Sequence, residues 1–85
     1  MNRLVGKVCV VNGAASAIGQ AVAGRFGSEG GVVVGVDQVE HAVGQLAVRA
    51  DLADEAQVEA MYEQVVREYG RLDVIYNNKP MLSGR

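Results

Sequence analysis

The chain has 85 residues, of which 49% are hydrophobic and 21% are charged, and its formal net charge at pH 7 is −2. This length limits it to one small domain, and the hydrophobic fraction is too high for a disordered protein. The charge balance argues against a nucleic-acid partner, and a single cysteine excludes an internal disulfide framework. No apolar run reaches the roughly 20 residues of a membrane span, and none precedes a cleavage site. We therefore expect a cytoplasmic protein without a membrane partner.

A strand, a loop of small residues and the start of a helix are predicted in the stretch Lys7–Gly19, KVCVVNGAASAIG. The apolar run Val8–Val11 is typical of a strand buried on both faces, and Cys9 within it is most simply a small buried residue. The loop after Asn12 lets backbone N–H groups approach a phosphate, which the N-terminus of the following helix also attracts. This stretch is therefore a candidate phosphate-binding loop.

The first helix is expected over residues 17–29. Within it Ile18, Val22 and Phe26 recur at four-residue spacing, which predicts that they share its buried face. The glycine pair that follows is a typical C-terminal stop.

A second strand, residues 32–36, is almost entirely β-branched and ends at Asp37. The segment 38–45 shows no helical periodicity and is shorter than a helical crossover requires, so we expect no full helix there. His41, in this segment, has no Cys, His or acidic partner at ligand spacing. We interpret it as a solvated loop residue and predict no metal site. A third strand is expected at residues 46–50.

The second helix is predicted from Asp54 to Tyr69 by the strongest periodicity in the chain, formed by Val58, Met61, Tyr62, Val65, Val66 and Tyr69. Asp54 favours the helix start as an N-cap, and Gly70 ends the helix. A fourth strand, residues 72–76, follows. The order of these elements predicts an α/β fold: a partial doubly wound, Rossmann-like sheet of four parallel strands in the order 3-2-1-4, with two main helices.

Four motifs in this order resemble the N-terminal part of the short-chain dehydrogenase/reductase family. The family's glycine loop, Thr-Gly-x-x-x-Gly-x-Gly, is similar to Asn12–Gly19 with two departures, and its acidic residue after the second strand corresponds to Asp37. Its Asp-aliphatic pair after the third strand corresponds to Asp51-Leu52. Its Asn-Asn-Ala-Gly after the fourth strand is matched by Asn77-Asn78 alone. Four motifs in the right context are far more specific than a lone glycine loop.

The resemblance implies roles for the residues of the loop. Gly13 allows the sharp turn out of the strand, and Gly19 lets the helix pack close to the sheet. Backbone donors near Ser16 and Ile18 would face the pyrophosphate of a dinucleotide cofactor. The alternative, that small residues merely make a strand–helix turn, is disfavoured by the motifs downstream.

The resemblance also implies an adenosine site. Asp37 would accept hydrogen bonds from a ribose 2′-hydroxyl, and because its carboxylate would repel the 2′-phosphate of NADP, NAD is the expected cofactor. Asp51 and Leu52 would flank the adenine, and Asn78 would lie against the ribose. For Asp51 a plain helix-entry role is the alternative.

The chain departs from the family pattern at several points. Asn12 replaces a threonine whose hydrogen bond braces the loop, and Ala17 places a Cβ where backbone should approach the diphosphate. The family's chemistry uses a Ser, a Tyr and a Lys four residues after that Tyr. None of the three tyrosines here is followed by a lysine at that spacing. We therefore assign no catalytic residue.

The sequence thus predicts the NAD-binding portion of an oxidoreductase, truncated before its catalytic residues. Residues 1–78 would form the N-terminal part of a Rossmann domain, and residues 79–85 a divergent tail that we interpret as out-of-frame sequence. Intact relatives would transfer a hydride between NAD and an alcohol or carbonyl, whereas this chain alone is expected to be inactive. A non-catalytic nucleotide-binding module, a non-functional remnant and a protein that self-associates through its bare sheet edge remain alternatives.

Overall fold

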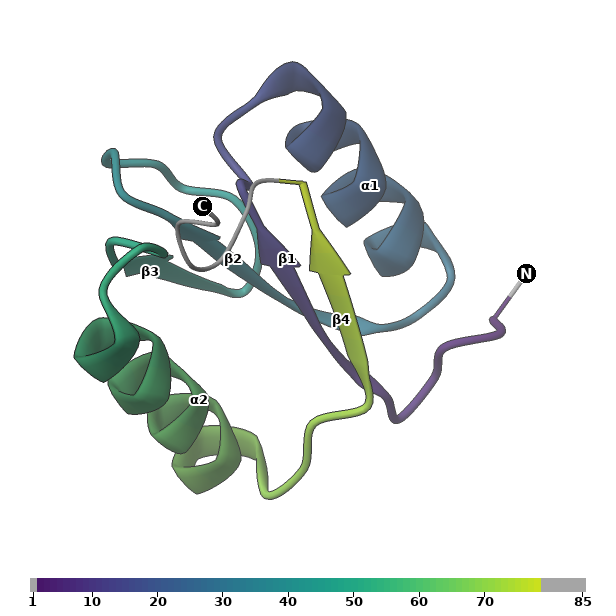
Figure 1. Ribbon diagram of the computed structural model, residues 1–85. Coiled ribbons are helices and arrows are strands. Elements are labelled where there is room, and N and C mark those ends of the chain that lie inside the picture. Colours follow the sequence, from purple (N-terminus) through teal and green to yellow (C-terminus); the bar gives the residue numbers. More distant parts are fainter. Residues whose placement is uncertain (1, 79–85) are drawn as a thin grey trace.

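A computed structural model describes residues 2–78 of the chain, and the tail at 79–85 lies outside the described residues (Figure 1). The elements follow each other as β1 (Val8–Asn12), α1 (Ala17–Ser28), β2 (Val32–Asp37), β3 (Leu46–Arg49), α2 (Glu55–Tyr69) and β4 (Val74–Asn77). None of the helices among these residues is long and apolar enough to cross a membrane.

The four strands form one parallel sheet in the order β3-β2-β1-β4, which confirms the predicted fold class. In the register, Val10 of β1 lies between Val34 of β2 and Ile75 of β4. Every residue of β1 is buried, because this strand lies inside the sheet and both of its faces are covered by a hydrophobic core. Among the strands of the described residues, β4 has β1 as its one neighbour and lies at an edge of the sheet.

One helix covers each face of the sheet (Figure 1). Because side chains alternate between the two faces of a strand, the buried residues divide into two cores. The core on the α2 face contains Val8, Val10, Val34, Val36, Ala50, Leu52, Met61 and Val65. The smaller core on the α1 face contains Val11, Ala14, Ala23 and Val33, with Val22, Phe26 and Tyr76 packed against it.

The buried face of α1 differs from the predicted one. The residues that are buried are Gly19 and Ala23, whereas Ile18 is 60% exposed. Small side chains let the helix backbone approach the loop and the sheet closely, and this approach turns Ile18 toward solvent. The prediction that Ile18 belongs to the buried face is therefore wrong.

Helix α2 begins and ends as its sequence predicts. The Asp54 side chain accepts hydrogen bonds from the first-turn N–H groups, and Gly70 ends the helix with a positive φ of 77°. Met61 and Val65 are fully buried against the sheet. Val66, which was expected on the same face, is 49% exposed because it lies at the margin of the apolar stripe.

The connection between β2 and β3 contains no helix, as predicted, but His41 is not a solvated residue. Its Nδ1 accepts a hydrogen bond from the N–H of Val43 (3.1 Å), so Nε2 carries the proton and donates to the carbonyl of Val48 (3.0 Å). The half-buried ring therefore fastens the connection to β3. Gln45 fastens the connection to β2. Its N–H donates to the carbonyl of Val33, and its side-chain oxygen accepts from the N–H of Val33, at 2.8 Å each.

An aspartate joins the beginnings of β1 and β4. Asp73 accepts a hydrogen bond from the N–H of Val8 (2.8 Å) and two from the guanidinium of Arg71 (2.8 and 2.9 Å). The bonds from Arg71 and Val8 lower the pKa of Asp73 to about 2. Burial, followed by the charge of Asp73, raises the pKa of the nearby Cys9 thiol, which is fully buried in β1 as expected.

Candidate functional site

The carboxyl ends of the four strands share one edge of the sheet, because all the strands are parallel. There the register pairs Asn12 with Asn77 and Asp37 with Arg49. After β1 the chain passes through α1 on one face of the sheet, and before β4 it passes through α2 on the other face (Figure 1). β1 and β4 are nevertheless neighbours in the sheet. The strand order therefore reverses between β1 and β4, and open α/β sheets bind ligands at such a point.

The loop between β1 and α1 is held by the end of β2. Gly13 has a φ of +84°, which only glycine adopts without strain, and it turns the chain out of β1. The N–H groups of Gly13 and Ala14 both donate to the carbonyl of Val36, at 2.8 and 3.0 Å. The loop therefore has one well-determined path across the carboxyl end of the sheet.

Ser16 is the N-cap of α1. Its hydroxyl accepts a hydrogen bond from the N–H of Gly19 (3.0 Å) and donates to the carbonyl of Gly13 (2.9 Å). The N–H groups of Ala17 and Ile18 precede the intrahelical ladder, so they have no acceptor within the helix. Both residues are exposed. These two donors are available to an anionic ligand at the helix N-terminus.

Gly19 was expected to let α1 pack close to the sheet. In the structure it lets α1 approach the loop that follows β1. A Cβ added at Gly19 would overlap the carbonyl oxygen of Gly13 and crowd Ala14. The residue is therefore required by the geometry of the loop itself.

Asp37 faces the loop and is 1% exposed. One carboxylate oxygen accepts a hydrogen bond from the N–H of Ala15 (3.0 Å), and the other accepts from the N–H of Gln38 (2.8 Å). The predicted ribose acceptor is thus in direct contact with the loop.

Asn78 lies against the same loop from the other side. Its side-chain amide donates to the hydroxyl of Ser16 (2.5 Å), and its N–H donates to the carbonyl of Asn12 (2.9 Å). The side chain of Asn12 instead bonds to Asn77 (2.6 Å), so it joins β1 to β4. The structure therefore brings Ser16, Asn78 and the loop together, as a shared site requires.

Asp51 and Leu52 diverge after β3. The Asp51 carboxylate accepts a hydrogen bond from the N–H of Ala53 (2.9 Å), and its own N–H donates to the side chain of Gln57 (2.8 Å). Leu52 is 6% exposed and packs in the core on the α2 face. Of the pair, Asp51 lies at the surface of the site and Leu52 lies beneath it.

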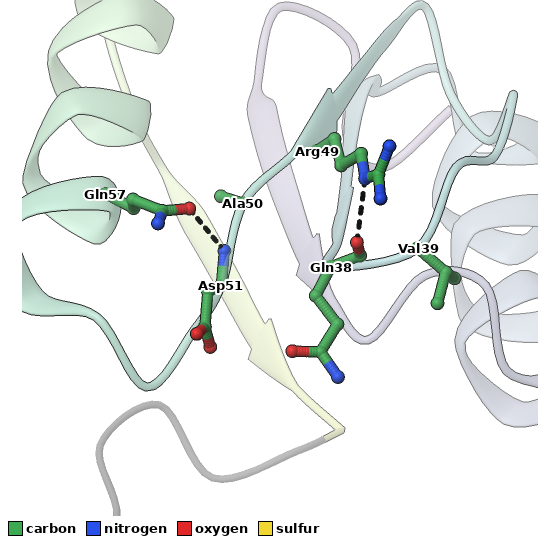
Figure 2. A pocket seen from close by; sticks show the side chains of 6 residues that line it. All are labelled: Gln38, Val39, Arg49, Ala50, Asp51 and Gln57. Atoms are coloured by element: carbon green, nitrogen blue, oxygen red, sulfur yellow. Dashed lines mark hydrogen bonds between the residues drawn. The ribbon is translucent and has the colours of Figure 1, made fainter.

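An open cavity of about 510 Å³ lies between the ends of β2 and β3 and the start of α2. It is lined by Gln38, Val39, Arg49, Ala50, Asp51 and Gln57 (Figure 2). The Nε of Arg49 donates to the carbonyl of Gln38 (2.9 Å), which ties the two sides of the cavity together. Within residues 2–78, no cluster of His, Cys, Asp and Glu side chains could hold a metal ion.

Sequence reasoning named Asp51 in this cavity but missed Arg49 and Gln57. Gln57 had a signal, because Asp54 and Gln57 have the spacing of a capping box, and their side chains are hydrogen-bonded at 3.1 Å. The sequence signal for Arg49 was weaker: Arg49 is a cation at the carboxyl end of a predicted strand, two residues before Asp51, where a ligand would bind.

A family model described as short chain dehydrogenase matches residues 7–83. The meso-2,3-butanediol dehydrogenase of Serratia marcescens is 37% identical over 86 aligned positions, which cover 89% of this chain and 34% of that protein. The 3-oxoacyl-[acyl-carrier-protein] reductase of Thermotoga maritima is 36% identical, and the match covers 89% of this chain and 36% of that protein.

The interpretation of residues 79–85 as out-of-frame sequence stays a prediction.

Solved structures show the same similarity. The ligand-free aldohexose dehydrogenase of Thermoplasma acidophilum superposes with a TM-score of 0.82 at 32% identity, over 91% of this chain and 31% of that one. A double mutant of a Serratia marcescens short-chain dehydrogenase/reductase gives 0.76 at 38% identity, over 88% of this chain and 35% of that one. The chain spans about a third of the length of the relatives that it matches.

Proposed function

The chain belongs to the short-chain dehydrogenase family, whose members bind a nicotinamide dinucleotide, and from this premise we propose that it binds the adenosine half of that cofactor. The ligand would lie across the carboxyl ends of the strands. Its pyrophosphate would meet the N–H groups of Ala17 and Ile18, and its adenosine would lie near Asp37, Asp51 and Asn78.

The observation that carries this proposal is the contact of Ser16 with Asn78 and of Ala15 with Asp37. Residues at the ends of two strands, β2 and β4, contact the loop that follows β1, at the point where the strand order reverses. The exposed Ile18 supports the same site, because a bound ligand would cover an apolar side chain that the fold leaves in water.

NAD is the proposed cofactor in preference to NADP. The carboxylate of Asp37 carries a negative charge beside the expected position of the ribose 2′-oxygen, and a 2′-phosphate there would be repelled. Ala17 has its Cβ at the exposed start of α1, where it narrows the approach of the diphosphate, so we propose weak binding overall.

The activity of the whole-length relatives is also a proposal for this chain. Those relatives would transfer a hydride between the nicotinamide and an alcohol or carbonyl. The 85 residues contain no Tyr with a Lys four positions later, so we propose that this chain binds the cofactor without catalysing the transfer.

The proposal is tested by titrating the isotope-labelled chain with ADP-ribose and following backbone amide signals by NMR. We expect shifts for the loop 13–19, for Asp37 and for Asn78. Nicotinamide riboside, which lacks both the adenosine half and the phosphates, is the control ligand and should shift none of them. Absence of loop shifts at millimolar ADP-ribose, or equal shifts with the control ligand, would contradict the proposal. The same sample with NAD and an alcohol should form no NADH.

Self-association is a second candidate, favoured by the position of β4. This strand is at the sheet edge, and Ile75 in it is 46% exposed. An uncharged edge strand with an exposed apolar side chain is a template for a strand from another chain. A second copy of this chain could pair there.

A further inference from the structure

Arg49 is a cation in the cavity without a carboxylate partner among the described residues. The ion pairs in that part of the chain are Arg25–Glu29 and Arg71–Asp73. The Nε of Arg49 is anchored on the carbonyl of Gln38, and this bond leaves the terminal guanidinium nitrogens for other acceptors (Figure 2). An arginine held by its Nε is pre-oriented to donate to a phosphate with its remaining N–H groups.

Arg49 lies beside the expected ribose position. It is the register partner of Asp37, and partners in neighbouring parallel strands project from the same face of the sheet. Its anchor is the carbonyl of the residue that follows Asp37. A group attached to the ribose 2′-oxygen near Asp37 would therefore extend toward the guanidinium.

The two carboxylates of the site, those of Asp37 and Asp51, are hydrogen-bonded to backbone N–H groups, and neither forms an ion pair with Arg49. Asp37 is nearly completely buried, bonded to the N–H groups of Ala15 and Gln38, and absent from the cavity lining. Asp51 does line the cavity, but its carboxylate is bonded to the N–H of Ala53 and points away from Arg49 in Figure 2. Arg49 therefore supplies the positive charge at the end of the cavity near Gln38.

We propose that Arg49 is a specificity-determining residue that binds the 2′-phosphate of NADP and so reduces the preference for NAD that Asp37 establishes. This inference rests on the proposed adenosine site. It makes the selectivity of the chain the result of two opposed charges on neighbouring strands.

The test compares NAD and NADP binding, by NMR titration, in the unmodified chain and in Arg49→Gln. Glutamine keeps an N–H donor for the carbonyl of Gln38 but removes the charge. We expect NADP to bind about tenfold more weakly to the variant, which is the usual effect of losing one charged hydrogen bond, with NAD affinity unchanged. Arg67→Gln, on the exposed face of α2, is the matched control and should change neither affinity.

The outcomes separate this inference from the proposed function. If NAD binds and Arg49→Gln weakens NAD and NADP equally, or neither, the inference is overturned while the proposed function stands. If neither dinucleotide binds the unmodified chain, both are overturned. If NADP binds through Arg49 and NAD does not bind, the inference stands and the proposed preference for NAD fails. A thermal melt of Arg49→Gln that matches the unmodified chain confirms that the fold is intact.

Discussion

The site depends on single residues whose backbone or size has no substitute. Gly13 adopts a positive φ at the exit of β1, and Gly19 lies against the carbonyl of Gly13. Ser16 bonds to both of these glycines and to Asn78. These residues form one connected unit, so a change at one of them should alter the whole loop.

Gly19→Ala tests this dependence. The added Cβ would overlap the carbonyl oxygen of Gly13, and backbone would have to shift to accommodate it. We expect a loss of about 1–3 kcal/mol in the free energy of unfolding, the usual cost of overpacking, together with loss of ADP-ribose binding. Urea unfolding and the NMR titration measure the two effects.

Gly24→Ala is the matched control for that variant, because it adds the same methyl group to the same helix with nothing within 4 Å. It should stabilise the chain by about 0.5–1 kcal/mol, since alanine loses less backbone entropy in a helix than glycine. Equal destabilisation by both substitutions would show that the loop contact is not the cause.

At the scale of elements, the sheet is joined at both ends of the β1–β4 pair. Asn12 and Asn77 bond at the carboxyl end (2.6 Å), and Asp73 bonds to the N–H of Val8 at the other end (2.8 Å). The pKa of Asp73 is lowered from 3.8 to about 2, mainly by the hydrogen bonds from Arg71 and Val8. Because the folded chain binds this proton less tightly than the unfolded chain does, the carboxylate stabilises the fold above about pH 4. That stabilisation is lost as the pH falls toward 2.

Asp73→Asn should therefore lower the melting temperature at pH 7 and have a smaller effect at pH 2. Melts of both chains across this pH range check the sign. The pKa of Glu29 is also lowered, first by the N–H of Arg3, so the variant should retain some pH dependence of its own. An equal loss at pH 2 and pH 7 would show that the charge of Asp73 is not what joins the strands.

At the scale of the whole molecule, two helices cover four strands within residues 2–78, and the cover is incomplete at β4. Ile75 is the register partner of Val10, which lies in the core on the α2 face of the sheet. Ile75 therefore projects from the same face, but it is 46% exposed because α2 does not cover the sheet at β4. Small domains have a net free energy of unfolding of only about a few kcal/mol. Leaving an apolar sheet edge in water therefore costs a large fraction of that net free energy. We expect a domain of marginal stability that associates through this edge.

Ile75→Lys should reduce the apparent molecular mass measured by light scattering at high concentration, because a charge on an edge strand opposes pairing with a second chain. Val66→Lys makes the same change at an equally exposed residue of α2 and should leave association unchanged. A monodisperse unmodified chain with a concentration-independent melt above about 65 °C, beyond the usual range of mesophile domains, would contradict the edge argument.

The structure confirms most of the predicted fold because the signals for it are local. The periodicity of α2, the β-branched strands and the missing helix between β2 and β3 were all correct. The errors concern residues whose neighbours are distant in the chain. Ile18 was assigned to a buried face that Gly19 occupies, and His41 was assigned to solvent although it bonds to Val48.

The sequence by itself determined the element order and the place of each motif at the end of a strand, because hydrophobic period, caps and turn residues act between near neighbours. The strand order followed from the doubly wound arrangement that this element order predicts. Only the tertiary structure decided what those motifs touch. It turned Asp37 onto the loop, drew Leu52 into the core and placed Arg49 in the cavity. These contacts depend on the register of the parallel strands, and register is a property of the assembled sheet that no single stretch of the chain contains.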